Sequence, residues 1–290
     1  MLMTFMHEPF GYNPPKSEPV MARIFEGCGI MGAKAHIADG SIDVVINDPP
    51  FGIKGDVIGS EYRNQGKTRN VIAGYVEIPR EQYQDFAFST VAEVARVLRP
   101  GGSAYFILSF QTMHHFICAI EEHGLILRNN IVWQYPGIWQ DHKYTVGHHN
   151  IIYVIKPPLA AVWFDPYARY GDSKKSYADR MDVWTDIPQK KHHNGEIRNM
   201  NSLPDGLVEK MLAYSSRPGD TVLDMFLGEF TTAKVALKMG RSVFGFEINP
   251  HAVKTFAPTL KGNVEVTRLN PAMSNRLTWR SSKSEAFCDV

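Results

Sequence analysis

The sequence predicts an α/β fold in which a doubly wound, mostly parallel sheet forms a single domain of 290 residues. Strand-like and helix-like segments alternate along most of the chain, which is typical of parallel strands joined by crossover helices. The clearest such unit is 221–247, where a strand, a glycine turn, a helix and a second strand follow one another. A hydrophobic content of 44% suffices for a full core, so no separate second domain is required.

A first strand is expected at 41–47, because this stretch is rich in β-branched residues and stops at two prolines. It delivers Asp48 to the carboxyl edge of the sheet. Pro49 and Pro50 form a stiff turn, since they lack an amide hydrogen and have a fixed φ, and the preceding carbonyls point outward unpaired. A carboxylate and free carbonyls can accept both hydrogens of an exocyclic amine while Phe51 stacks on its ring, which indicates a pocket for a nucleobase amine.

An isolated Asp-Pro-Pro is more often only a turn that ends a strand, so context decides. The stretch 221–247 continues from a buried strand through a tight turn at Gly228 and a helix at 231–240 to a strand ending in Glu247. In a doubly wound sheet, such a unit binds a nucleoside at the carboxyl edge, and the acidic residue at the end of the second strand hydrogen-bonds to the ribose hydroxyls. The alternative is an ordinary βαβ unit in which Gly228 only relieves packing.

Together these motifs resemble those of the S-adenosylmethionine-dependent amino-methyltransferases of DNA, β subclass, in which the catalytic motif precedes the cofactor motif. The resemblance extends from about residue 22 to about residue 250 and includes further segments at 96–102, 130–133, 147–150 and 218–224. It implies a Rossmann-like fold of the class I methyltransferase type with a circularly permuted order of motifs.

The resemblance also implies roles for individual residues. The catalytic motif corresponds to Asp48, Pro49, Pro50 and Phe51. The residues expected to contact the cofactor, S-adenosylmethionine, are Cys28, Asp224, Phe226, Gly228, Thr231, Glu247 and Asn249.

The chain departs from the family pattern in three places. Phe230 replaces a usual glycine of the cofactor loop, so the backbone there is not expected to approach the methionine moiety in the usual way. Cys28 stands where relatives tend to have the aspartate that binds the adenine amine, so Glu26 or a backbone group would have to replace it. The segment 201–204 lacks the basic residue that many relatives carry before a proline.

Double-stranded DNA is the expected partner, although a net charge of +1 requires that positive charge be segregated on one face. The stretch 52–80 is polar and irregular, with basic residues and tyrosines, and is expected to be a mobile loop over DNA or substrate. The stretch 157–201 is the expected target-recognition region, because this region lies between the catalytic and cofactor halves in β-subclass relatives. Residues 271–290 are expected to form a flexible tail.

No metal site is expected. Methyl transfer from a sulfonium needs no metal, and adjacent histidines such as His148 and His149 point in different directions, so they rarely chelate one ion. Both are instead expected to be orienting or structural residues near the pocket. The three cysteines are too few and too scattered for a zinc site or a disulfide framework.

A cytoplasmic location in a prokaryotic or phage-infected cell is expected. The first residues do not resemble a signal peptide, and no apolar stretch is long enough to span a bilayer. The resemblance also suggests a homodimer, and it leaves open whether a cognate restriction enzyme accompanies the protein.

The expected reaction is transfer of a methyl group to the N6 amine of an adenine that has left the duplex. Adenine is favoured over the N4 amine of cytosine only because Asp-Pro-Pro is mostly associated with adenine in this family. An amine in RNA, a protein side-chain amide, and a cofactor-binding or DNA-binding protein that has lost catalysis are the alternatives.

Overall fold

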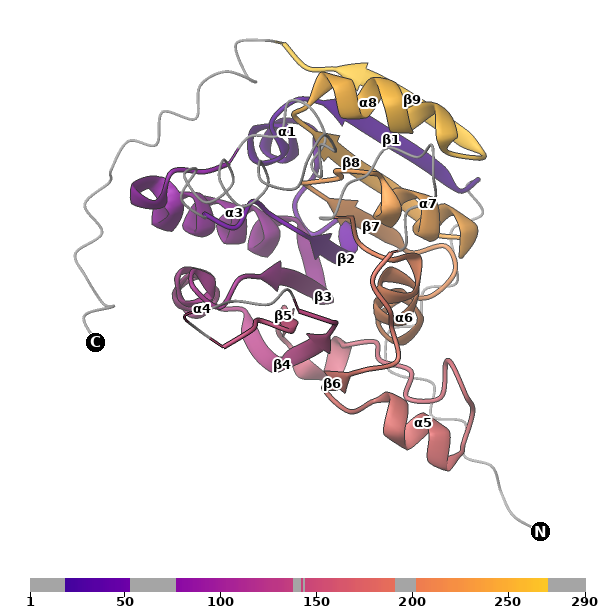
Figure 1. Cartoon of the computed structure of the whole chain (residues 1–290). Coiled ribbons are helices and arrows are strands. Elements are labelled where there is room, and N and C mark those ends of the chain that lie inside the picture. Colours follow the sequence, from indigo (N-terminus) through magenta and orange to yellow (C-terminus); the bar gives the residue numbers. More distant parts are fainter. Residues whose placement is uncertain (1–18, 53–76, 138–141, 143, 191–201, 271–290) are drawn as a thin grey trace, which may run out of the picture.

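The computed structural model describes residues 19–52, 77–137, 142, 144–190 and 202–270. Within this part of the chain, nine strands form one sheet in the order β6-β4-β5-β3-β2-β7-β8-β1-β9 (Figure 1). The strands are β1 (Met21–Glu26), β2 (Ile42–Asn47), β3 (Leu98–Leu108), β4 (Ile126–Gln134), β5 (His148–Ile155), β6 (Val183–Trp184), β7 (Thr221–Asp224), β8 (Ser242–Glu247) and β9 (Asn263–Arg268).

The sheet is mostly parallel, as predicted. Among the described strands, only β5 runs antiparallel to its neighbours, β3 and β4, and the remaining pairs are parallel. After β2 the next strand in the chain, β3, is added on one side of the β2–β7 pair, and after β7 the next strand, β8, is added on the other side. The adjacent strands β2 and β7 therefore form a topological switch point, where open α/β sheets bind their ligands beyond the carboxyl ends of the strands.

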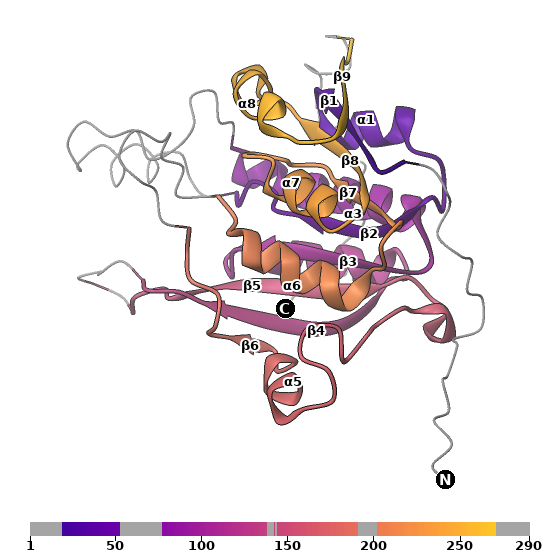
Figure 2. The same cartoon turned by 90° about the vertical axis from the view of Figure 1, so that its right-hand side faces the viewer.

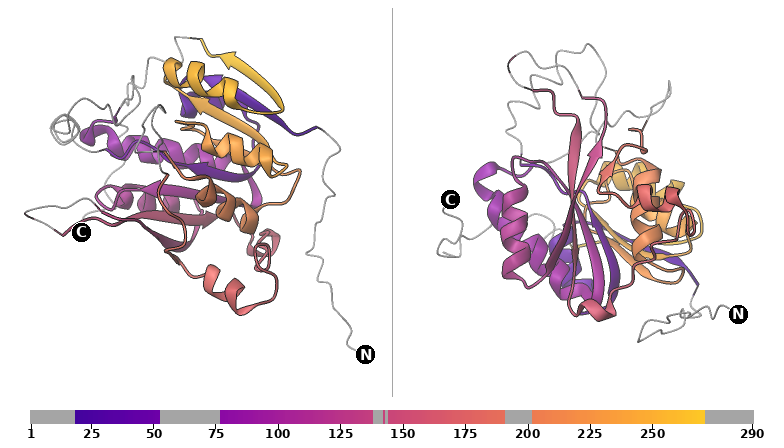
Figure 3. Two further views of the ribbon diagram at one scale, coloured as in Figure 1. Left: turned by 45° about the vertical axis from the view of Figure 1, so that its right-hand side comes forward. Right: turned by 90° about the horizontal axis from the view of Figure 1, so that it is seen from below.

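Helices cover both faces of the sheet (Figures 2 and 3). One face carries α1 (Gly29–His36), α3 (Tyr83–Val97) and α4 (Met113–Glu122), and the other carries α6 (Asp205–Ser215), α7 (Thr231–Lys238) and α8 (Pro250–Phe256). The short helix α5 (Lys174–Asp179) lies beyond the sheet edge at β6. Single 3-10 turns are η1 (Arg80–Gln82), η2 (Leu159–Ala161) and η3 (Ala257–Thr259).

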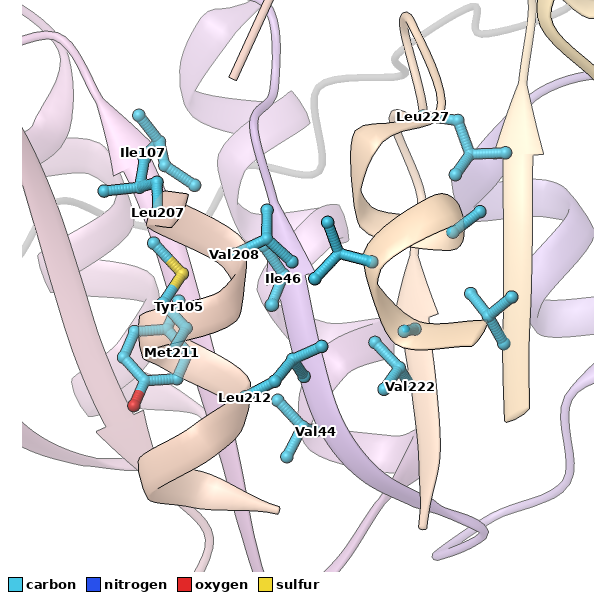
Figure 4. Close-up of a cluster of buried hydrophobic side chains, with 14 of the residues drawn as sticks. Val44, Ile46, Tyr105, Ile107, Leu207, Val208, Met211, Leu212, Val222 and Leu227 are labelled. Carbon is cyan, nitrogen blue, oxygen red and sulfur yellow. The ribbon is translucent and has the colours of Figure 1, made fainter. Parts of the chain in front are cut away.

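Strand β2 is central and contributes to the core on both faces, which explains its run of β-branched residues. Val44 and Ile46 are fully buried on the face of α6 and α7, and Val45 is fully buried on the face of α3. Figure 4 shows Val208 and Leu212 of α6 directed toward this strand. The packing fixes the end of β2, and thus the position of the residue that follows it.

The predicted elements around the two motifs are observed. The strand expected at 41–47 is β2, and the helix expected at 231–240 is α7, which ends earlier, at Lys238. The end is set by Gly240, whose φ of 78° is left-handed. No described helix is long and apolar enough to cross a membrane.

The other predicted segments are described only in part. Residues 53–76, which make up most of the expected loop at 52–80, lie outside the described residues, as does the expected tail at 271–290. Of the expected target-recognition region, the part up to Lys190 is described and contains η2, α5 and β6. The division into one domain with these segments remains a prediction.

Candidate active site

One cavity lies at the carboxyl ends of β2, β7 and β8, and all eleven residues predicted for the site line it. Asp48, Pro49, Pro50 and Phe51 form one part of the wall. Cys28, Asp224, Phe226, Gly228, Thr231, Glu247 and Asn249 form another. The two motifs, far apart in the sequence, thus meet at the switch point because β2 and β7 are neighbours in the sheet.

The backbone of the Asp-Pro-Pro-Phe turn is held by side chains from other elements. The hydroxyl of Tyr83 donates to the Pro50 carbonyl at 2.8 Å, and the hydroxyl of Thr112 donates to the Phe51 carbonyl at 2.9 Å. The Pro49 carbonyl accepts no hydrogen bond from the described residues. The turn is therefore fixed from behind, and an acceptor is left for a ligand next to Asp48.

Carboxylates dominate the electrostatics of the cavity. Burial, and then the neighbouring carboxylate of Asp224, raise the pKa of Asp48 well above its usual range. Burial raises the pKa of Asp224 to about 7, although hydrogen bonds from Thr232 and the Phe226 amide oppose the shift. Burial also raises the pKa of Glu247. Raised values mean that the ionised carboxylates lack compensating positive charge, which a cationic ligand would supply.

The cofactor loop is fixed through the two carboxylates at the ends of β7 and β8. Glu247 accepts hydrogen bonds from the Gly228 amide through Oε2 and from the Asn249 amide through Oε1, both at 2.7 Å. Asp224 Oδ1 accepts from the Phe226 amide at 2.8 Å. Glu247 also accepts from the Ile248 amide, so one of about four acceptor sites on its two oxygens remains for a ligand hydroxyl.

The structure shows where the side chain of Phe230 lies. This residue adopts the left-handed conformation with a φ of 64°, which a glycine would adopt at no cost. Its side chain is 1% exposed and lies in the core near Phe256, with the ring centroids 6.4 Å apart. Gly228 and Thr231 on either side still line the cavity. Phe230 therefore costs backbone strain, of about 1–3 kcal/mol, without its side chain blocking the loop.

The substitution at Cys28 is not compensated by Glu26. Cys28 is buried at the start of α1 and lines the cavity. The carboxylate of Glu26 pairs instead with Arg268 at 3.0 Å, and Glu26 is not among the described residues around the cavity. The other expected replacement for the missing aspartate, a backbone group, stays a prediction.

An aromatic wall lies beside the Asp-Pro-Pro-Phe turn. From the sequence, Trp133 is expected to be core or pocket wall, Tyr135 is a candidate for lining the base pocket, and His149 is expected near the pocket. Trp133 and His149 line the cavity, and the His149 ring centroid lies 5.5 Å from that of Phe51 and 4.9 Å from that of Tyr135. Burial, and then the neighbouring His148, lower the pKa of His149 to about 4, so its ring is neutral. The Phe51 and His149 rings are therefore in contact, and both line the cavity.

Sequence reasoning missed a charged pair in the cavity wall. Lys190 belongs to the expected target-recognition region at 157–201, and no individual role was given to it or to Glu229. Both line the cavity, and their Nζ and Oε2 atoms are 2.6 Å apart. A charged residue directly after the glycine of the cofactor loop was the available signal in the sequence.

Comparisons with known proteins agree with this geometry. A family model described as DNA methylase matches residues 42–258. The DNA adenine methyltransferase YhdJ of Escherichia coli (strain K12) is 28% identical over 282 residues, covering 86% of this chain and 88% of its own. The type II methyltransferase M.BglII of Bacillus subtilis is 25% identical over 266 residues, covering 83% and 69%.

Solved structures show the same fold. A putative DNA modification methylase from Thermus thermophilus superposes with a TM-score of 0.61 at 22% identity, covering 86% of this chain and 100% of that chain. The PvuII DNA methyltransferase, described as cytosine-N4-specific, gives a TM-score of 0.63 at 17% identity, covering 87% and 92%.

The sheet with its cavity at the switch point is that of a class I S-adenosylmethionine-dependent methyltransferase. The chain belongs to the DNA methylase family, which comprises the N4 and N6 amino-methyltransferases of DNA, and its methyl donor is S-adenosylmethionine. The predicted family and cofactor are thus confirmed.

Proposed function

We propose that the protein methylates the N6 amine of adenine in double-stranded DNA. The observation that carries this proposal is the meeting of Asp48, Pro49, Pro50 and Phe51 with the cofactor loop in one cavity. The residues proposed to hold the cofactor are Cys28, Asp224, Phe226, Gly228, Thr231, Glu247 and Asn249. The carboxylates among them suit a cationic sulfonium, since each has a raised pKa that a nearby cation would relieve.

The chain's own residues bind and orient the amine. The target base leaves the duplex, because its amine is otherwise stacked and paired. Phe51 stacks on the base, a contact of about 1–3 kcal/mol. Asp48 and the Pro49 carbonyl accept the two amine hydrogens, which localises the nitrogen lone pair for attack and stabilises the developing positive charge. The bound cofactor supplies a methyl group made electrophilic by its sulfonium, and no covalent enzyme intermediate is needed.

Adenine is proposed over cytosine on two grounds. The motif begins with aspartate, which this family associates mostly with adenine. The relative YhdJ, which is named as an adenine methyltransferase, is similar over most of both chains. Methylation of cytosine N4 is the second candidate, since the PvuII enzyme, described as cytosine-N4-specific, shares the fold.

DNA contacts are proposed for the stretches 52–80 and 157–201, which flank the cavity motifs in the sequence. Two further partners remain predictions: a second copy of the chain in a homodimer, and a cognate restriction enzyme. Several relatives are named type II methyltransferases, which supports the prediction of a cognate restriction enzyme.

The test is incubation with S-adenosylmethionine carrying a labelled methyl group and unmethylated genomic DNA, followed by mass spectrometry of the nucleosides. Label on N6-methyl-2′-deoxyadenosine supports the proposal, and label on N4-methyl-2′-deoxycytidine replaces it with the second candidate. No label in DNA, while the cofactor still binds, would contradict both and indicate another substrate or a protein that has lost catalysis.

A further inference from the structure

We propose that Glu229 and Lys190 together bind the amino-acid end of the cofactor, with Glu229 accepting from its ammonium group and Lys190 donating to its carboxylate. This inference rests on the proposed function of the cavity. It concerns Glu229, a residue of the cofactor loop to which the sequence analysis gave no role, and Lys190, which lies outside both motifs.

Glu229 carries an unused acceptor in a buried place. Its side chain is 4% exposed, and Oε2 is 2.6 Å from Lys190 Nζ. Its second oxygen, Oε1, is buried and has no hydrogen-bond partner among the described residues. An unpartnered buried carboxylate oxygen is costly. A ligand that brings an ammonium group to this place would remove the cost.

Lys190 is positioned to hold the opposite charge. Its ammonium group donates to Glu229 and also to Ser202 Oγ at 3.0 Å, while its side chain remains 34% exposed. Lysine has three donors, so one is left for a ligand carboxylate. Ser202 belongs to the segment that lacks the basic residue expected there, so Lys190 supplies a positive charge beside that gap.

The pair is located at the loop before α7, where the family resemblance places the methionine moiety of the cofactor. Glu229 is located between Gly228 and Thr231 on the loop before α7, whereas Glu247, at the end of β8, is placed for the ribose. An α-amino acid carries one positive and one negative group on the same carbon. Lys190 and Glu229 present the complementary charges side by side. The ligand carboxylate can pair with Lys190 and the ligand ammonium with Glu229, so no buried charge is left uncompensated.

The test compares three ligands by calorimetric titration without turnover: S-adenosylhomocysteine, its decarboxylated form, and 5′-methylthioadenosine, which lacks the amino-acid end. Glu229→Gln should weaken the first two by about tenfold or more, because a charge-assisted hydrogen bond is lost, and should leave methylthioadenosine unchanged. Lys190→Met should weaken only S-adenosylhomocysteine by about the same factor.

Lys234→Met is the matched control, because Lys234 also makes a 2.7 Å ion pair, with Asp205, but does not line the cavity. Thermal melts of each variant establish that it is folded, and the double variant Lys190→Met/Glu229→Gln avoids leaving one buried charge alone. Equal weakening of all three ligands, or no weakening, would overturn the inference. Failure of the unaltered protein to bind any of them would instead overturn the proposed site.

Discussion

Two buried carboxylates, Asp48 and Asp224, give the cavity its chemical character at the scale of single residues. Both have a raised pKa, chiefly because burial removes water from the ionised form. A protein tolerates this cost where the ionised form is needed by a ligand. In the proposed mechanism, the cation of the cofactor and the positive charge that develops on the attacked amine are two such partners. Each would stabilise an ionised carboxylate that is unfavourable in the free protein.

Cofactor affinity should therefore rise with pH. In the free protein the pKa of Asp224 is about 7, and a bound cation favours the ionised form, so binding below that pH must release a proton. Affinity for S-adenosylmethionine should increase about tenfold or more between about pH 5.5 and about pH 8. Titrations in buffers of different ionisation enthalpy measure the proton release. Constant affinity over this pH range, with no proton released, would contradict the proposal that Asp224 is ionised when the cofactor binds.

At the scale of elements, the catalytic turn depends on helices that do not carry it. Tyr83 opens α3 and Thr112 precedes α4, and their hydroxyls hold the Pro50 and Phe51 carbonyls. Gly52 follows the turn with a φ of 68°, and a Cβ there would lie 2.4 Å from the Tyr83 ring. The turn and the start of α3 are thus packed too closely for a side chain between them.

Thr112→Val should reduce the rate of methyl transfer while leaving cofactor affinity nearly unchanged. The variant loses the hydrogen bond to the Phe51 carbonyl, with a stability cost of about 1 kcal/mol, and frees the stacking residue to move. Separate measurement of kcat and of the cofactor Kd checks this. Thr255→Val removes a comparable hydroxyl bond, to the His251 carbonyl on α8, and should affect neither. Equal kcat for both variants would show that the bond does not position the turn.

The sequence predicted the elements and residues that belong to continuous motifs. A strand followed by Asp48 and a strand followed by Gly228 could be recognised locally, and their meeting followed from the rules of parallel sheets. The contacts from Tyr83, Thr112 and Lys190 could not be recognised, because they join residues 33, 61 and 39 positions apart in the chain through tertiary packing. The orientation of the Phe230 side chain was also unpredictable, since it depends on space available in the core.

At the scale of the whole molecule, an ionic cluster joins the region of α5 and β6 to helix α6. Lys210 of α6 is 1% exposed and pairs with Asp179 at 3.1 Å and with Asp186 at 3.2 Å. Its ammonium also lies 4.7 Å from the centre of the Trp184 ring. Through these contacts, the segment proposed to read DNA is attached to the helix that packs on the central strands.

Lys210→Met should destabilise the fold by about 2 kcal/mol, because Asp179 would lose a buried charged hydrogen-bond partner but keep its ion pair with Arg169. Urea unfolding measures the effect. Lys234→Met, which removes an exposed ion pair with Asp205, should cost less than about 1 kcal/mol. A loss from Lys210→Met as small as that of the control would mean that the cluster does not hold the segment.

The proposed mechanism depends above all on Asp48 acting on the amine and not on the cofactor. The decisive measurement compares the unaltered protein with Asp48→Ala for both cofactor affinity and methyl transfer to DNA. We expect nearly unchanged affinity, because the residues proposed to hold the cofactor remain, and a loss of transfer of at least about a hundredfold. An Asp48→Ala variant that transfers methyl groups at the original rate would show that this carboxylate does not act on the amine.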